Sequence, residues 1–137
     1  MKINTALFYA LLLLWNNCDL LDEQVIDISG KVTNDGDPVG GAIVLLVNGT
    51  DISDGLSLTN GSISMSNGKY TIFDVDPGDY YVLAIEDNNG NQEFDADTDR
   101  LGFHGVVPEN LDLIPDEITV DDSDLENIDI VDLYSLE

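Results

Sequence analysis

A chain of 137 residues is long enough for one domain with a single hydrophobic core. Its 28 acidic residues outnumber four basic ones, and the formal net charge of −24 argues against partners such as nucleic acid or anionic lipid headgroups. Because 43% of the residues are hydrophobic, the chain can bury enough surface to fold, and its single cysteine excludes an internal disulfide.

The N-terminus has the features of an export signal. Lys2 supplies a positive charge, residues 6–15 form an uninterrupted apolar run, and the polar residues Asn16 and Asn17 follow. The run is too short to span a bilayer, which needs about 20 apolar residues. Cys18 stands directly behind this segment and resembles the cysteine that is acylated in bacterial lipoproteins.

The lipoprotein resemblance implies three parts: a signal peptide over residues 1–17, a lipid-anchor cysteine and tether over 18–24, and a β-domain over 25–137. Trp15 and Asn17 depart from the Leu and the small residue that lipoproteins usually have there. The expected location is the cell envelope, where the lipid holds the protein to the membrane on its periplasmic or cell-surface face. An ordinary signal peptide or an uncleaved hydrophobic anchor is the alternative.

The first half of the domain has the patterns of β-strands. In residues 25–33 apolar and polar side chains alternate, which is typical of a strand buried on one face. Residues 34–38 supply a turn. Residues 42–47 are apolar at every position, so we expect a central strand covered on both faces. The Ser- and Gly-rich stretch 50–61 predicts a long loop with a short edge strand.

Two turn signals follow. The Asn-Gly pair at 67–68 lies between two strand-like segments and predicts a β-hairpin with a type I′ turn. The Asp-Pro-Gly sequence at 76–78 predicts a type II turn, because glycine tolerates the positive φ that this turn requires.

Three more segments, residues 80–85, 118–120 and 128–133, alternate like strands, and no helical period is present outside the signal. Seven or so short strands separated by Gly, Pro and Asn turns predict an all-β fold, a seven-stranded antiparallel β-sandwich.

Four stretches carry glycine and proline at positions that set turns: residues 28–32 (ISGKV), 36–44 (GDPVGGAIV), 68–72 (GKYTI) and 75–80 (VDPGDY). Together they resemble the carboxypeptidase regulatory domain-like family over residues 25–105. The resemblance implies a transthyretin-like sandwich with a non-catalytic accessory role on exported and surface proteins, and it assigns no ligand.

The stretch 87–99 (DNNGNQEFDADTD) places oxygen-bearing side chains at every second position. A curled loop with this spacing can turn carboxylates and amides toward one centre, and calcium takes six to eight oxygen ligands at about 2.3–2.6 Å. Asp87, Asn89 and Asn91 match the ligand positions one, three and five of an EF-hand loop. Two features differ from an EF-hand: Gln92 replaces the glycine at position six, and there is no bidentate Glu at position twelve. The predicted ligands are Asp87, Asn89, Asn91, the carbonyl of Glu93, Asp95, Asp97 and Asp99.

We therefore expect a calcium-stabilised loop that Phe94 anchors to the core. The alternative is an Asx-rich surface turn that is only solvated and holds no metal. The acidic stretch 121–124 lacks the alternating order and is expected to form a solvated turn. An outward-facing Tyr81 could belong to a glycan- or protein-binding surface.

The composition also argues against catalysis. Enzymes with a transthyretin-like architecture use a His and Arg cluster or hold iron with His and Tyr pairs, whereas this chain has one histidine, His104, and one arginine, Arg100. We expect a non-catalytic binding or accessory module with a protein or glycan partner at the cell surface. A passive structural domain is the alternative, and a hydrolase is a remote one.

Overall fold

The computed structural model describes residues 24–49, 58–107, 109 and 112–136. The predicted signal peptide, Cys18 and all of the tether before Gln24 lie outside the described residues, as does most of the predicted long loop. Among the described residues, no helix is both long and apolar enough to cross a membrane.

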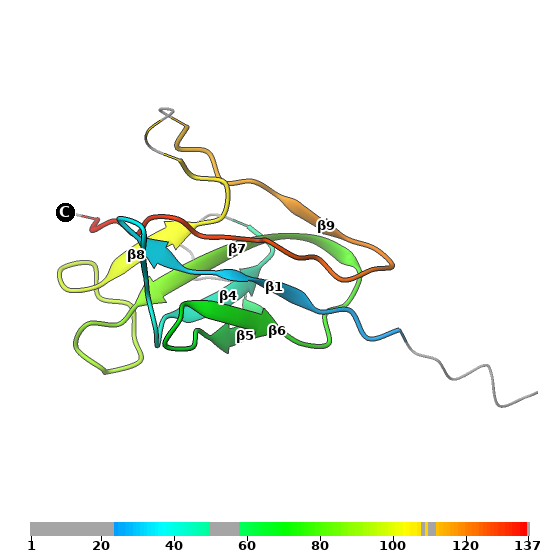
Figure 1. Ribbon diagram of the computed structural model, residues 1–137, viewed down its shortest axis with the longest axis horizontal. Coiled ribbons are helices and arrows are strands. Elements are labelled where there is room, and N and C mark those ends of the chain that lie inside the picture. Colours follow the sequence, from blue (N-terminus) through cyan, green and yellow to red (C-terminus); the bar gives the residue numbers. More distant parts are fainter. Residues whose placement is uncertain (1–23, 50–57, 108, 110–111, 137) are drawn as a thin grey trace, which may run out of the picture.

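The described chain is all-β, and its strands pair antiparallel in three sheets (Figure 1). β1 pairs with β6, β2 pairs with β3, and the largest sheet has the order β5-β4-β7-β8, with β9 also paired to β7. The predicted all-β antiparallel class is confirmed, whereas the count of seven strands is not. The strands are β1 (Ile28–Lys31), β2 (Thr33–Asn34), β3 (Asp37–Pro38), β4 (Ile43–Val47), β5 (Leu58–Ile63), β6 (Lys69–Ile72), β7 (Gly78–Glu86), β8 (Arg100–Phe103) and β9 (Ile118–Val120).

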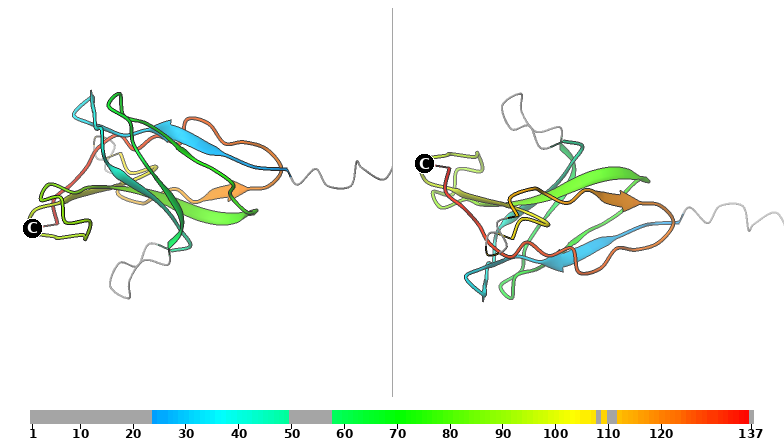
Figure 2. Two further views of the ribbon diagram at one scale, coloured as in Figure 1. Left: turned by 90° about the horizontal axis from the view of Figure 1, so that it is seen from below. Right: turned by 90° about the horizontal axis from the view of Figure 1, so that it is seen from above.

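The main core lies between the β1–β6 sheet and the largest sheet, which face each other as two layers (Figure 2). Ile28 and Ile72, which are register partners, contribute from one layer, and Val44, Leu46 and Val82 contribute from the other. Each of these side chains is at most 1% exposed. The arrangement is consistent with the predicted sandwich.

The prediction that β4 is covered on both faces is confirmed. Val44 and Leu46 point into the main core, whereas Val47 belongs to a second buried cluster with Leu83, Ile85 and Leu101. We call this second cluster the outer cluster. The half-buried residues packed against it are Ile43, Leu45, Tyr81, Phe94 and Phe103.

The C-terminal strap, residues 125–134, connects the two layers by lying beside β1 and then β8 (Figure 1). The Thr33 N–H donates to the Ile130 carbonyl at 2.9 Å, and Leu101 and Tyr134 exchange two backbone hydrogen bonds at 2.8 Å. The strap therefore closes the fold, but by isolated bridges and not as the regular strand expected over residues 128–133.

The chain does reverse at residues 67–68 as predicted, and Met65 N–H donates to the Lys69 carbonyl at 2.8 Å, but the predicted type I′ geometry and the pairing of the flanking strands are wrong. Gly68 has a φ of 80°, but Asn67 does not have the positive φ that a type I′ turn requires, and Gly68 N–H donates to the Met65 carbonyl at 2.8 Å. The flanking strands also separate, because β5 pairs with β4 while β6 pairs with β1. The turn carries the chain from one layer to the other.

The predicted type II turn at 76–78 is also wrong, because Gly78 does not adopt positive φ. Gly78 has a steric role instead, because a Cβ atom there would lie 3.0 Å from the Tyr80 hydroxyl, which donates to the Asp76 carbonyl at 2.9 Å.

A type I′ geometry occurs between β2 and β3, where Asp35 and Gly36 have φ values of 51° and 85°.

Candidate metal site

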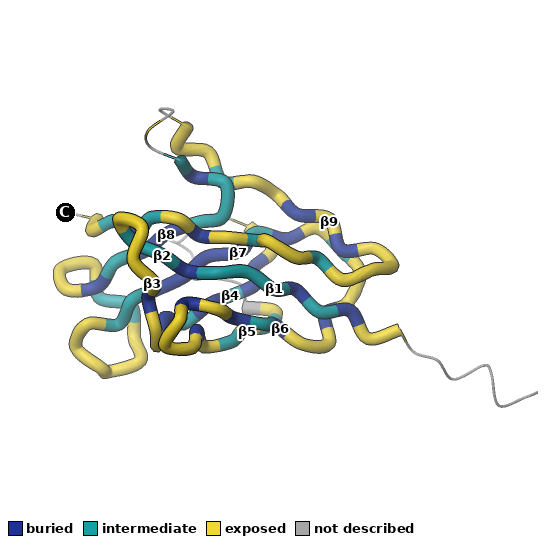
Figure 3. The backbone as a smooth tube through the Cα atoms, viewed as in Figure 1, coloured by how far each residue is buried: buried dark blue, intermediate teal, exposed yellow. Residues whose placement is uncertain are grey.

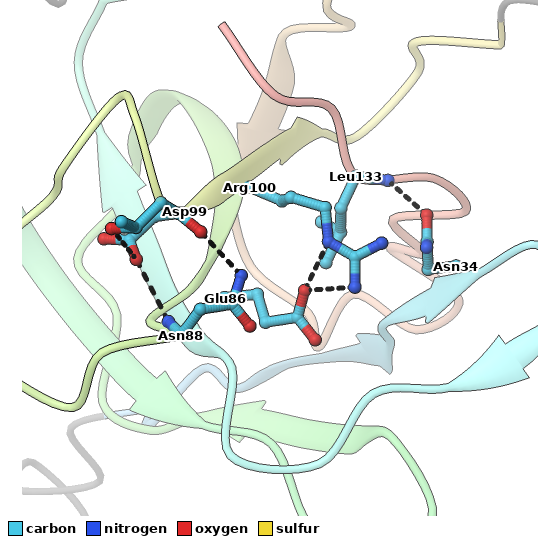
Figure 4. A network of polar contacts seen from close by, with 7 residues as sticks. Asn34, Glu86, Asn88, Asp99, Arg100 and Leu133 are labelled. Atoms are coloured by element: carbon cyan, nitrogen blue, oxygen red, sulfur yellow. Dashed lines mark hydrogen bonds and ion pairs between the residues drawn. The ribbon is translucent and has the colours of Figure 1, made fainter.

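The acidic loop, residues 87–99, connects β7 to β8 at the end of the molecule opposite Gln24 (Figures 1 and 2). Glu86 and Arg100 are register partners at the base of the loop. The Arg100 Nη2 atom lies 2.5 Å from Glu86 Oε2 and Nε donates to the same oxygen at 2.6 Å (Figure 4). This ion pair fixes the distance between the two ends of the loop.

Asp99 holds the loop closed from inside. It is only 1% exposed, and its carboxylate accepts a hydrogen bond from the Asn88 backbone N–H at 3.0 Å (Figure 4). It also accepts one from the Asp95 backbone N–H at 2.9 Å. The Thr98 hydroxyl donates a third at 3.2 Å. The bond from Asp95 is the main cause that lowers the pKa of Asp99, against the opposing effect of burial. Asp99 is thus a structural carboxylate in this geometry.

The first half of the loop is shaped by side chains that accept from the backbone. Asp87 Oδ1 accepts from Gly90 N–H at 2.7 Å, and Oδ2 accepts from Gln92 N–H at 2.8 Å. Asn89 Oδ1 accepts from Asn91 N–H at 3.1 Å. Such Asx turns fold the chain tightly enough for successive side chains to face the interior of the loop.

Gln92 has a φ of 64°, the left-handed conformation that favours glycine. It occupies the sixth position counted from Asp87, where EF-hand loops use glycine for the sharp turn. The turn is therefore present although the glycine is absent.

Three predicted ligands meet at the centre of the loop. Asn89 Nδ2 and Asn91 Nδ2 donate to Asp95 Oδ2 at 2.7 and 2.6 Å. Asn91 Oδ1 also accepts from Glu93 N–H at 2.9 Å. Both amides thus direct their NH2 groups at the Asp95 carboxylate and their oxygens at backbone N–H groups, so a cation at the centre would require the amides to turn.

The donor set contains few carboxylates. Among the described residues, no three His, Cys, Asp or Glu side chains gather into a group that could hold a metal ion. A calcium shell in this loop would have to combine Asp95 with amide and backbone oxygens, and Asn89 and Asn91 would have to present oxygen to the centre. The side chains of Glu93 and Asp97 are exposed, as is most of the loop (Figure 3).

Phe94 anchors the acidic loop as predicted. Its half-buried ring packs against the outer cluster on the face of the largest sheet opposite the main core. The loop is therefore attached to the domain by an apolar contact in its middle and by the ion pair at its base.

The other candidate residues lie elsewhere. His104 Nδ1 is 2.7 Å from the Asp129 carbonyl oxygen, and residues 121–124 are exposed. One oxygen of Asp124 accepts from the Asp27 N–H at 2.9 Å. Tyr81 is half-buried on the outer side of its sheet, packed against the outer cluster.

Sequence reasoning missed the part that Asn88 and Thr98 play. Asn88 Nδ2 donates to the Thr98 carbonyl at 2.8 Å and connects the two sides of the acidic loop. The alternating pattern emphasises odd positions, so it gave no weight to these two residues. The tendency of Asn side chains to bond nearby backbone was the available signal.

No protein-family model matches the chain, and no curated protein matches it. One solved structure with partial similarity is a 9R-lipoxygenase from Cyanothece PCC8801, with a TM-score of 0.41 and 11% sequence identity. The match covers 78% of this chain but 16% of the lipoxygenase chain. At that level of similarity the comparison carries no argument about fold or function.

Proposed function

We propose that the chain is an exported, lipid-anchored, non-catalytic accessory module of the cell envelope whose acidic loop binds calcium. In this proposal Cys18 carries the lipid, and residues 25–137 form a transthyretin-like seven-stranded sandwich of the carboxypeptidase regulatory domain-like type. The bound ion stabilises the domain and orders the surface that the loop presents.

The convergence of Asn89 and Asn91 on the Asp95 carboxylate is the observation that carries the calcium proposal. The Asx turns at Asp87 and the positive φ at Gln92 support it, because they fold the loop around these three side chains. Calcium accepts flexible shells that mix carboxylate, amide and backbone oxygens, so a single central carboxylate is compatible with binding, although with modest affinity.

The position of the acidic loop supports a surface role. The described chain begins at Gln24, and the loop lies at the far end of the domain from it (Figure 1). A lipid on Cys18 would hold the end near Gln24 close to the membrane. The loop and the neighbouring outer cluster would then point away from the bilayer, toward a protein or glycan partner.

Thermal unfolding of the chain beginning at Asp19 tests the calcium proposal. A ligand that binds only the folded state at 100 times its Kd adds about 2.7 kcal/mol, so millimolar calcium should raise the Tm above that in chelator. The double variant Asp87→Ala plus Asp95→Ala should lose this increase. The matched control, Asp121→Ala plus Asp122→Ala, removes the same charge from another exposed stretch and should keep it.

Equal Tm values with calcium and with chelator would favour the alternative, a passive domain with a solvated loop.

The proposal that the protein is not an enzyme has a separate test. A panel of ester, peptide and glycoside substrates should show no turnover, and activity that survives in the calcium-site variant but not in His104→Ala would favour a hydrolase.

A further inference from the structure

The outer face of the β1–β6 sheet is polar. Ile28 and Ile72 pack in the main core, so the residues that alternate with them on the two paired strands point to the opposite face (Figure 1). These outward residues form two register pairs, Ser29 with Thr71 and Lys31 with Lys69. The face therefore carries two hydroxyl groups and two ammonium groups side by side.

The lysine pair is unusual in a chain that has four basic and 28 acidic residues. Like charges placed directly opposite each other on paired strands destabilise a sheet. In the part of the chain that the structure describes, neither lysine forms an ion pair, whereas Arg100 pairs with Glu86. An anionic ligand that contacts both ammonium groups would relieve their mutual repulsion.

A cleft of about 380 Å³ lies over this polar face, and its lining includes all four outward residues. The C-terminal strap supplies another part of the lining through Glu126, Asn127 and Asp129. One oxygen of Asp129 accepts from the Lys31 backbone N–H at 2.9 Å, which fixes this carboxylate at the cleft. The sheet thus contributes cationic donors, and the strap contributes side chains that can accept hydrogen bonds from hydroxyl groups.

We propose that this cleft, which we call the lysine cleft, binds an anionic glycan built from uronic acids. The ammonium groups of Lys31 and Lys69 bind sugar carboxylates, and Glu126 and Asp129 accept hydrogen bonds from sugar hydroxyls. An acidic peptide fits less well, because its Asp and Glu side chains bring no hydroxyl groups to these two acids. The proposal names the partner class of the proposed binding module and therefore rests on that binding role.

The net charge of −24 does not prevent this contact. At physiological ionic strength the Debye length is about 8 Å, so exposed charges elsewhere on the domain are largely screened from the ligand. Groups inside the cleft contact the ligand directly. The lysine cleft is thus a local exception to the repulsion of polyanions that the composition predicts.

Isothermal titration of oligogalacturonate and of oligomannuronate into the full chain tests the proposal, in non-ionic detergent, about 0.15 M salt and a calcium chelator. We expect one saturable site for at least one of the two sugars. Lys31→Gln plus Lys69→Gln should weaken binding at least about tenfold, because it removes both cations from the cleft. The matched control is Leu113→Glu plus Ile114→Glu, which lowers the net charge equally at side chains that are 68% and 74% exposed and should keep the affinity.

The methyl ester of the bound oligosaccharide separates charge from sugar recognition. It keeps the sugar rings but lacks the carboxylate charges, so it should bind at least about tenfold more weakly. Circular dichroism checks that each variant keeps its sheet content. Because chelator is present throughout, a failure of the calcium proposal leaves these results unchanged.

Three outcomes would overturn the proposal. The first is absence of binding by both oligosaccharides, and the second is an equal loss of affinity in the two double variants. The third is binding of an oligoglutamate of the same length as tightly as the sugars, which would show that the cleft recognises charge without a glycan.

Discussion

Replacing Ile130 by Ala should destabilise the domain more than its position near the C-terminus suggests. The Ile130 side chain is fully buried in the main core, although it comes from the C-terminal strap. Its backbone is fixed on both sides, since Ile130 N–H donates to Lys31 O and Ile130 O accepts from Thr33 N–H, both at 2.9 Å. The strap therefore cannot move in to fill the cavity.

An Ile to Ala change in a core costs about 2–5 kcal/mol, and a site that cannot collapse falls in the upper part of that range. We expect a loss of about 3–4 kcal/mol and a fall in Tm of roughly 10–20 °C. Urea denaturation followed by circular dichroism measures the loss. Val131→Ala changes the next residue, which is 39% exposed, and should stay within about 0.5 kcal/mol. Equal effects of the two substitutions would refute the assignment of the strap to the core.

Three other substitutions test single features. Tyr134→Phe should leave the Tm unchanged or raise it, because the Tyr134 hydroxyl is buried without a partner among the described residues. Burial and the charge of Asp132 raise the pKa of Tyr134 to about 12, so wild type should lose stability between the ordinary value of 10.0 and that value. The variant should lose less over the same range, and the loss that remains comes from groups such as Tyr70, whose pKa burial also raises. Asp99→Asn should lower the Tm at neutral pH, because folding lowers the pKa of the Asp99 carboxylate. The difference in Tm between wild type and variant should shrink as the pH falls below the ordinary pKa of 3.8. A series of thermal melts from pH 2 to 7 measures this trend. Gln92→Val should cost about 1–2 kcal/mol in denaturant unfolding, since a β-branched residue is strained at a φ of 64°, whereas Gln92→Gly should not destabilise.

Strand positions were predictable from the sequence wherever burial follows a simple period. Val44 and Leu46 alternate with Ile43, Leu45 and Val47, and the two sets pack in different clusters, as an uninterrupted apolar run requires. The period is a local property of a strand. It fixes which side chains share a face without any knowledge of the neighbouring strands.

Strand pairing was not predictable in the same way. The Asn-Gly pair at 67–68 signals a reversal of the chain, but the flanking strands join different sheets because β4 and β1 offer partners that are distant in sequence. The strap gives weak local signals for the same reason. Its bonds to residues 27–34 join positions almost a hundred residues apart, such as the one that Lys31 N–H donates to Asp129 Oδ1, and its other backbone–backbone bonds run to Leu101.

In the candidate site the structure brings together three of the seven residues that the sequence predicted as ligands. These are Asn89, Asn91 and Asp95. The sequence could not distinguish Asp99 from Asp97, because spacing alone does not show which carboxylate is buried. The hydrogen bonds of Asp99 to the two sides of the loop make that distinction.

Isothermal titration of calcium into the purified domain tests the central proposal most directly. We expect one saturable site per chain, lost in Asp87→Ala plus Asp95→Ala and retained in Asp121→Ala plus Asp122→Ala. Absence of binding heat at millimolar calcium, or equal binding by the two double variants, would contradict a specific calcium site in the acidic loop.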